Sequence, residues 1–308
     1  MSNVIQYAQI FQTELDKAAV QQAVTGWMDK NAGKVKYTGG KEVKIPQLSV
    51  DGLGDYDRGS AGGYADGAIE LTYKTYEMTQ DRGRKFNLDA MDVDETNFIA
   101  TAGAVMGEFQ RTKVVPEIDA YRLSALATKA IEKGGAHVKY GYTADASTIL
   151  REIKQGIKVI REAGYNGQLV IHLTYDAKFE LEIALANKLA TVTWSQGGID
   201  TTVPVVDKCP LIETSSNLLV TAINLLDGVT EGQKEGGFKK ATSAKDVNFI
   251  IVAADVPLAV TKQDLMRIFD PNTNQKANAW SMDYRRYHDL WVLENKKNAI
   301  YANIKDAQ

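Results

Sequence analysis

The sequence contains a single cysteine, Cys209, among 308 residues. One cysteine cannot form a disulfide within the chain, so the composition suits a reducing compartment. Cys209 lies in the apolar run 205–212, where we expect a buried thiol with a structural role and not an activated nucleophile.

A basic excess and long apolar segments are also missing. The formal net charge is -3, whereas dedicated nucleic-acid-binding proteins usually carry a surplus of Lys and Arg. No stretch approaches the ~18 consecutive apolar residues of a membrane helix, and residues 1–7 do not resemble a signal peptide. We therefore expect no membrane partner and synthesis in a cytoplasm. With 44% hydrophobic residues, the chain can still form an ordinary globular core.

Motifs that carry catalysis are absent as well. The glycines between residues 52 and 63 are not followed by the Lys-Ser/Thr pair of a P-loop, and they lie between two expected strands, not between a strand and a helix. His137, His172 and His288 share no metal-ligand spacing, and no glycine-flanked serine suits a nucleophile. We therefore expect no catalytic, cofactor-binding or metal-binding residues, and no enzyme. His172 falls in an apolar strand, which favours a hydrogen-bonded core residue.

Two charged clusters have simpler explanations than ligand binding. The acidic residues 89–95 lack the loop glycine and the final glutamate of an EF-hand, and helix capping explains most of them. They are Asp89, Asp92, Asp94 and Glu95. The basic run 82–85 could contact phosphate, but a solvated face or an ion pair between subunits is favoured.

The most informative segment is 41–88. Residues 41–45 and 68–73 alternate between polar and apolar side chains, which predicts two strands. Between them lie six glycines and four aspartates: Gly52, Gly54, Gly59, Gly62, Gly63, Gly67, Asp51, Asp55, Asp57 and Asp66. We expect a long β-hairpin with a polar, glycine-rich tip. A two-stranded ribbon is marginally stable in water, so its apolar side chains need another surface, and a second subunit could supply it.

Two helices flank this hairpin in the sequence. Apolar residues at spacings of three and four predict an amphipathic helix over 4–28, followed by a loose, glycine-containing segment. The same spacing predicts one very long helix over 92–133, which ends at Gly134-Gly135. Pro116 removes one hydrogen bond of this helix, so we expect a kink near 112–116.

The remaining chain predicts an α/β unit followed by strands. We expect a helix with Ile149, Ile153, Ile157 and Ile160 on one face, and a second helix opened by Asp176 as its N-cap that runs from 177 to about 189. The expected strands are 169–173, 203–212, 247–253, 279–293 and 299–304. Residues 228–245 predict a surface loop and 261–269 a short helix.

Five segments are similar to those of capsid proteins from phages and prophages of Gram-positive bacteria: 79–86, 89–96, 107–112, 269–275 and 283–292. The order of elements also resembles that of the major capsid proteins of tailed bacteriophages, which have the HK97-type fold. The resemblance covers essentially the whole chain. It indicates a relationship to this family and does not indicate any catalysed reaction.

The resemblance implies an α+β fold in four parts. Residues 1–40 would be an N-terminal arm, and 41–88 an extended loop that lies over a neighbouring subunit. Residues 89–144 and 261–308 would form a peripheral domain with the long spine helix and the C-terminal strands. Residues 145–260 would form a mixed α/β axial domain that meets its copies at five- and six-fold centres.

The resemblance further implies a structural subunit of an icosahedral head that encloses double-stranded DNA without sequence-specific binding. Its partners would be copies of itself as pentamers and hexamers, a portal, and in some relatives scaffolding or decoration proteins. It would be located in the virion after assembly in the cytoplasm of a bacterial host. No scaffolding segment precedes the arm, so scaffolding would be a separate protein. No lysine and asparagine match the cross-link that some relatives make, and we expect none.

Two other functions remain open at this point. An encapsulin-like bacterial compartment shares the fold and encloses cargo enzymes, but the similar segments favour a phage protein. A cytosolic α/β enzyme would need its site beside the sheet of 145–260, where the sequence offers only His172 with Asp176 nearby.

Overall fold

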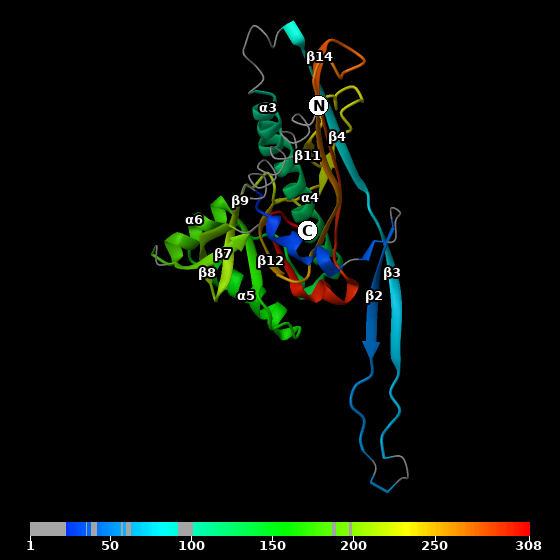
Figure 1. Cartoon of the computed structure of the whole chain (residues 1–308). Coiled ribbons are helices and arrows are strands. Elements are labelled where there is room, and N and C mark those ends of the chain that lie inside the picture. The colour runs from blue at the N-terminus through cyan, green and yellow to red at the C-terminus, as the bar shows by residue number, and fades with distance from the viewer. Residues whose placement is uncertain are drawn as a thin grey trace.

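The protein is described here by a computed structural model, which covers residues 23–34, 36–37, 42–56, 58–59, 63–91, 101–186, 189–196 and 199–308. The helices α3 (Thr101–Phe109) and α4 (Val115–Lys133) follow one another through the body (Figure 1). A lobe with α5, α6 and β7–β9 lies on one side, and the long strands β4 and β14 lie on the other. The hairpin of β2 and β3 extends far from this body.

A seven-stranded sheet forms the centre of the lobe. Its order is β5 (Val138–Lys139), β15 (Ile300–Ile304), β12 (Val247–Ala253), β6 (Leu169–Thr174), β9 (Cys209–Thr214), β8 (Ile199–Val206) and β7 (Ala190–Gln196). Every residue of β6, β12 and β15 is buried, because helices or other elements cover both faces of these central strands. The expected strands at 169–173, 247–253 and 299–304 are therefore confirmed.

Helix α5 (Ile149–Glu162) packs on this sheet with the four expected isoleucines buried. Helix α6 (Tyr175–Ala184) corrects the prediction at both ends. Its N-cap is Thr174, whose Oγ1 accepts a hydrogen bond from the Ala177 N–H at 3.2 Å, so Asp176 lies inside the first turn. The helix ends at Ala184 and not near 189, and the chain then turns with Ala186 at a φ of 49°.

Gly156 allows α5 to approach the sheet closely. A Cβ at this position would lie 2.7 Å from both Ile251 Cδ1 and Tyr301 Cδ1. We expect Gly156→Leu to lower the free energy of unfolding by about 3 kcal/mol, because the larger side chain overpacks a buried contact. Urea unfolding of the dissociated subunit measures this. Gly33→Leu, at a helical glycine with nothing within 4 Å of its Cβ and no positive φ, controls for generic loss of glycine; an equal loss in both variants would contradict the packing argument.

The long helix consists of α3 (Thr101–Phe109), a π-helical turn η3 (Gln110–Val114) and α4 (Val115–Lys133). The interruption overlaps the expected kink at 112–116. Pro116 has no N–H to donate to the Thr112 carbonyl, so the regular hydrogen-bond pattern cannot continue through this turn. Gly134, at a φ of 63°, ends α4 as expected. The capping box at Asp92 and Glu95 lies outside the described residues.

A second sheet has the order β13–β14–β4, from β13 (Leu258–Phe269), β14 (Ala279–Trp291) and β4 (Gln80–Asp89). The short helix expected over 261–269 is wrong, because this segment pairs with β14 along nearly its whole length. Strand β4 was not predicted either; it follows the hairpin and pairs with β14 over ten residues. The third sheet, β1–β2–β3, contains β1 (Lys36–Tyr37), β2 (Glu42–Val50) and β3 (Ile69–Glu77).

Three further differences concern strands. The single strand expected over 203–212 is two strands, because Asp207 and Lys208 form a tight turn with φ of 48° and 65° between β8 and β9. Strand β15 pairs with β12, so the end of the chain joins the sheet of the lobe, although the sequence grouped it with β14. The expected loop 228–245 also contains β11 (Phe238–Lys240), which pairs with β10 (Ile223–Leu225).

The start of the described chain packs into the body. Most of the helix expected over 4–28 lies outside the described residues, and residues 26–34 form a 3-10 helix, η1 (Gly26–Lys34). Trp27 is buried in the core of the lobe, where its ring stacks on His172 at 5.9 Å. Two short 3-10 turns, η4 (Gly135–His137) and η5 (Glu294–Ala299), precede β5 and β15.

Candidate assembly surface

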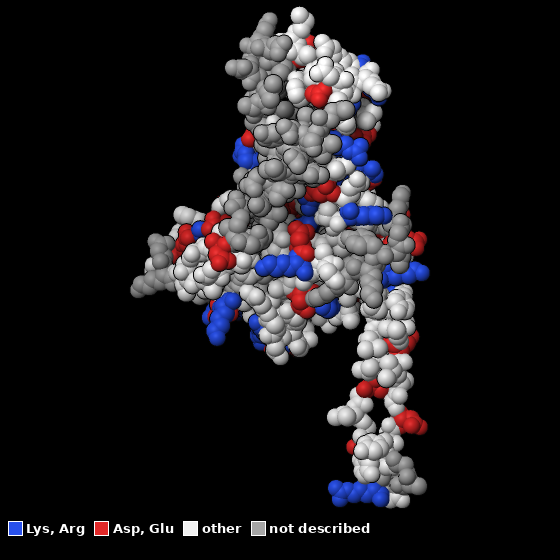
Figure 2. Space-filling view, viewed as in Figure 1, with Lys and Arg blue, Asp and Glu red and all other residues white. Residues whose placement is uncertain are grey.

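The hairpin confirms the expectation of two paired strands with a long glycine-rich tip. Strands β2 and β3 pair antiparallel from Glu42 with Glu77 to Val50 with Ile69. Beyond this last pair, the chain continues to a tip that lies far from the body (Figure 2). The hairpin therefore presents two faces and a tip to its surroundings.

Only the base of the hairpin is anchored. Val43 and Ile45 are buried in a small apolar cluster whose other buried members are Met78, Leu258, Val260, Tyr287 and Trp291. The ring of Tyr76 packs on that of Trp291 at 5.6 Å, and Lys74 pairs with Glu294 at 3.4 Å. These contacts fix the direction in which the hairpin leaves the body.

One face of the hairpin beyond this base is apolar. Cross-strand pairing places Pro46 opposite Tyr73, Leu48 opposite Leu71 and Val50 opposite Ile69. Because strand side chains alternate, these pairs share one face, which is opposite to the face of Val43 and Ile45. We call these six residues the apolar ribbon face. The five large side chains other than Pro46 are between 53% and 75% exposed.

The described residues do not cover this face, and folding the hairpin further onto its own base would not cover it either. The anchored residues point to the other side, so extending their packing along the ribbon would bury polar residues such as Gln47 and Thr72. Burying the five large side chains against a partner would contribute about 5–9 kcal/mol before the cost of association. A contiguous exposed apolar patch of this kind is typical of an interaction site.

The tip adds an aromatic and acidic surface. Tyr56 and Tyr64 pack edge to face at 4.9 Å, and Leu53 is fully exposed beside them in sequence. Gly63, at a φ of 66°, is required here, because a Cβ would lie 2.5 Å from the Tyr56 ring. The described tip residues carry more Asp than Arg, which predicts a partner surface that is not acidic.

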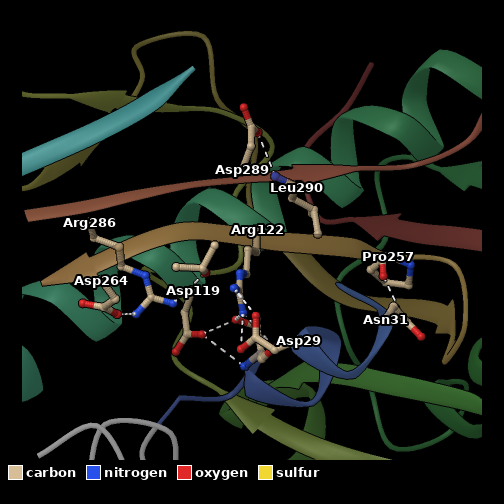
Figure 3. Close-up of polar contacts among 11 residues, drawn as sticks. Asp29, Asn31, Asp119, Arg122, Pro257, Asp264, Arg286, Asp289 and Leu290 are labelled. Atoms are coloured by element: carbon tan, nitrogen blue, oxygen red, sulfur yellow. Dashed lines mark hydrogen bonds and ion pairs between the residues drawn. The ribbon is translucent and has the colours of Figure 1, made fainter. Parts of the chain in front are cut away.

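A buried polar cluster joins the start of the chain to α4 (Figure 3). The Asp119 carboxylate accepts hydrogen bonds from the N–H groups of Val24 and Thr25 at 3.0 and 3.1 Å, and from the Thr25 hydroxyl. Arg122, which is 1% exposed, donates to Asp29 at 2.6 Å and to the Thr25 carbonyl at 3.2 Å. The cluster therefore fixes residues 24–29 against α4.

Burial raises the pKa of the Asp119 carboxyl to about 6, although Thr25, Val24 and Arg122 act in the opposite direction. Between about pH 4 and pH 6 the folded chain therefore binds a proton that the unfolded chain releases. Below about pH 4 the Asp119 carboxyl makes its full contribution to the free energy of unfolding. We expect that contribution to fall by about 3 kcal/mol as the pH rises from 4 to above 6.

Asp119→Asn removes this titration, since an amide does not ionise. We expect the free energy of unfolding of the natural protein, measured in urea from pH 4 to pH 7, to fall relative to that of the variant. Parallel pH profiles for the two proteins would contradict the raised pKa.

The three histidines and Cys209 are buried among packing and hydrogen-bonding partners. His172 is fully buried, as expected, and its Nε2 accepts a hydrogen bond from the Trp27 indole N–H at 3.2 Å. Burial lowers its pKa to about 3, so the ring is neutral. His137 Nδ1 lies 3.0 Å from the Ile300 carbonyl, and His288 is buried against Tyr121. Cys209 is buried as expected, and burial raises its thiol pKa.

Arg82 and Arg84 of the basic run 82–85 bind within the chain and do not form the expected solvated face, whereas Lys85 is 45% exposed. The ion pair between subunits stays a prediction. Arg82 pairs with Glu117 of α4 at 2.8 Å and also donates to the Gly237 carbonyl at 3.3 Å. Arg84 donates to the Lys234 carbonyl at 3.0 Å. Through these hydrogen bonds to backbone carbonyls, the two arginines of β4 hold the loop before β11 in place.

The acidic run gives no evidence of a cation site. Asp89 accepts a hydrogen bond from the Met91 N–H at 3.0 Å, and Asp92, Asp94 and Glu95 lie outside the described residues. Within the described chain, no group of three or more His, Cys, Asp or Glu side chains could hold a metal ion. None of the described helices is long and apolar enough to cross a membrane.

The pairing of His172 with Asp176 that an enzyme would use does not occur. His172 is a fully buried residue of β6 whose ring is covered by Trp27. Asp176, by contrast, is exposed on the first turn of α6. The two residues are therefore not brought together at an accessible site.

Comparison with known proteins finds similarity in structure only. No family model matches the sequence, and no curated protein sequence matches it. The solved structure of Mycobacterium phage Che8 matches with a TM-score of 0.54 and 15% identity over 87% of this chain and 86% of that chain. The mature capsid of bacteriophage PhiM1 matches with a TM-score of 0.55 and 12% identity, over 87% and 82% of the two chains. The capsid of the cyanophage P-SCSP1u matches with a TM-score of 0.56 and 8% identity, over 87% and 84%.

These similarities define the fold class. The chain has the α+β fold of phage capsid structures, and the match extends over most of both chains in each comparison. This is the HK97-type fold that the sequence segments indicated. The TM-scores of 0.54–0.56 establish a shared fold, and at identities of 8–15% the match establishes the fold alone.

Proposed function

We propose that this chain is the structural subunit of a tailed-phage head. Copies assemble as pentamers and hexamers into a closed icosahedral shell around double-stranded DNA, and the chain catalyses no reaction. The apolar ribbon face carries this proposal, because it is a large apolar surface that the described part of the chain leaves exposed. The shared fold with phage capsid structures supports the same conclusion.

In this proposal, each part of the chain has an assembly role. Residues 41–88 are the extended loop, whose ribbon lies over a neighbouring copy, and 1–40 form the arm. The peripheral domain, 89–144 and 261–308, supplies the rigid spine, and the axial domain, 145–260, surrounds the five- and six-fold centres. Strand β15 belongs by its pairing to the sheet of the axial domain.

Partners and location follow from the same role. A portal occupies one vertex, and any scaffolding or decoration proteins are separate chains. The subunit carries a net charge of -3, so repulsion by the DNA phosphates keeps its contacts with the enclosed DNA weak. The DNA is enclosed without sequence-specific binding. Assembly takes place in the bacterial host cytoplasm and the finished protein resides in the virion.

Expression of the chain alone tests the proposal. We expect closed shells or ring-shaped capsomers by negative-stain electron microscopy and a fast-sedimenting species by analytical ultracentrifugation. Compact monomers or dimers at all protein concentrations would contradict the proposal. The contents of shells from infected cells separate two roles: packaged DNA supports a phage head, whereas a cargo enzyme without DNA would support an encapsulin-like compartment.

A further inference from the structure

Helix α6 exposes an apolar stripe that the fold leaves uncovered. Tyr175, Phe179 and Ile183 follow one another at a spacing of four residues and are between 52% and 61% exposed. At about 100° per residue these side chains lie on one side of the helix, opposite the buried Ala177 and Leu181. The stripe therefore points away from the sheet of the lobe.

Carboxylates border this stripe on both sides. The same rotation places Asp176 and Glu180 along one edge and Glu182 along the other. The one lysine of this helix, Lys178, pairs with Glu182 at 3.3 Å and with Glu213 of β9. Because these four carboxylates outnumber the single ammonium group, the α6 face is acidic with an apolar centre.

Helix α5 carries the opposite charge on its outer side. Arg151, Lys154 and Lys158 are exposed and lie together opposite the buried isoleucines, and Lys208 extends from the nearby turn between β8 and β9. Two exposed carboxylates oppose them: Asp207 lies 3.7 Å from Lys154, and Glu162 lies 3.5 Å from Lys158. Such solvent-exposed pairs are weak, so this face remains basic.

The two faces lie on different sides of the same lobe. Figure 1 shows α6 at its upper side and α5 at its lower side. In the matching space-filling view, acidic side chains gather toward the α6 side and basic ones toward the α5 side (Figure 2). The lobe is therefore polarised in charge from one side to the other.

We propose that the α6 face of one copy docks on the α5 face of the next copy. This inference rests on the proposed function and names the surfaces through which the axial domains meet. A second copy is the occupant because the complementary charge is on the same chain, so each copy offers one face of each kind. Two α6 faces would bring like charges together, which excludes a two-fold contact. A contact between unlike faces repeats head to tail, and it forms a ring where the rotation from one copy to the next closes, as in a pentamer or hexamer.

Paired charge reversals test this contact. One variant carries Glu180→Lys and Glu182→Lys, a second carries Lys154→Glu and Lys158→Glu, and a third combines all four changes. All four positions are at least partly exposed, so each variant keeps the core of the lobe intact, which circular dichroism and thermal unfolding verify. The control reverses an exposed pair elsewhere, Glu231→Lys with Lys234→Glu.

We expect each double variant to raise at least tenfold the protein concentration at which shells or capsomers form, measured by sedimentation velocity. The variant with all four substitutions restores assembly. Mixing the two double variants restores it partly, because the basic α6 face of one variant matches the acidic α5 face of the other. Normal assembly of both double variants, or no recovery in the variant with all four substitutions, overturns the docking of α6 on α5 while shells of the natural protein leave the proposed function intact. A natural protein that never assembles overturns both.

Discussion

Replacing Leu48 and Leu71 together by asparagine is expected to abolish shell assembly and leave the subunit folded. The two side chains pair across the apolar ribbon face and touch no core, so the dissociated subunit loses no packing. In the assembled state each copy loses about 3 kcal/mol of apolar burial, which weakens every such contact about a hundredfold. Sedimentation velocity and electron microscopy measure assembly, and thermal unfolding of the dissociated subunit measures folding.

The other face of the same strands provides a matched control. Ser49 and Thr72 lie on the polar face of the ribbon, so Ser49→Asn with Thr72→Asn changes the same two strands without removing apolar surface. We expect this variant to assemble like the natural protein. If both variants assembled normally, the apolar ribbon face would not be an interface, and if both failed, its apolar character would not be the cause.

Arg122→Met is expected to destabilise the subunit by about 3–5 kcal/mol, because it removes one partner of a buried polar cluster. The change leaves the Asp119 carboxylate buried without its cationic neighbour, and it leaves the Thr25 carbonyl without the guanidinium donor. Methionine retains much of the length of the side chain, so lost volume does not explain the effect. Urea unfolding of the dissociated subunit measures the free-energy change.

A second arginine of the same long helix serves as the control. Arg111 pairs with Glu108 at 2.6 Å, but both side chains are more than half exposed. We expect Arg111→Met to cost less than about 1 kcal/mol, as is usual for exposed ion pairs. A similar cost for Arg111→Met and Arg122→Met would show that the cluster of Asp119 and Arg122 does not anchor the start of the chain.

Local patterns in the sequence predicted the hairpin and the spine. The hairpin was visible because alternating strands flank a run of glycine and aspartate, a pattern that depends on neighbouring residues alone. The interruption of the long helix was visible because the missing N–H of Pro116 affects only the preceding turn. The alternating pattern indicated that the apolar side chains of the ribbon need another surface, Ile45 among them. The structure was required to show that Ile45 packs on the body and that only the opposite face is exposed.

The elements that the sequence did not predict depend mainly on pairing between strands that are distant in the chain. Residues 261–269 have apolar spacings that suit a helix or a strand, and the segment became β13 because β14 offers a pairing edge. The partner of β15 is β12, about fifty residues earlier, and no local pattern encodes such a choice. The turn at Asp207 and Lys208 contains no glycine that would have marked its positive φ values.

The buried cluster of α4 was missed, although the sequence holds a signal for it. Asp119 and Arg122 occupy the same helical row as the buried Val115 and Leu126. Polar residues at core positions of an amphipathic helix indicate a buried network, because an isolated buried charge is costly. The partners in residues 24–29 could not be inferred, since they approach from almost a hundred positions earlier in the chain.

Hydrogen–deuterium exchange of the hairpin amides, compared between dissociated subunits and assembled particles, tests the central claim most directly. A two-stranded ribbon without a supporting surface opens readily, so we expect the amides of residues 47–50 and 69–73 to exchange rapidly in the dissociated subunit. In assembled particles we expect their exchange to slow at least a hundredfold, because a neighbouring copy covers the apolar ribbon face. Equal exchange rates in the two states would contradict the account.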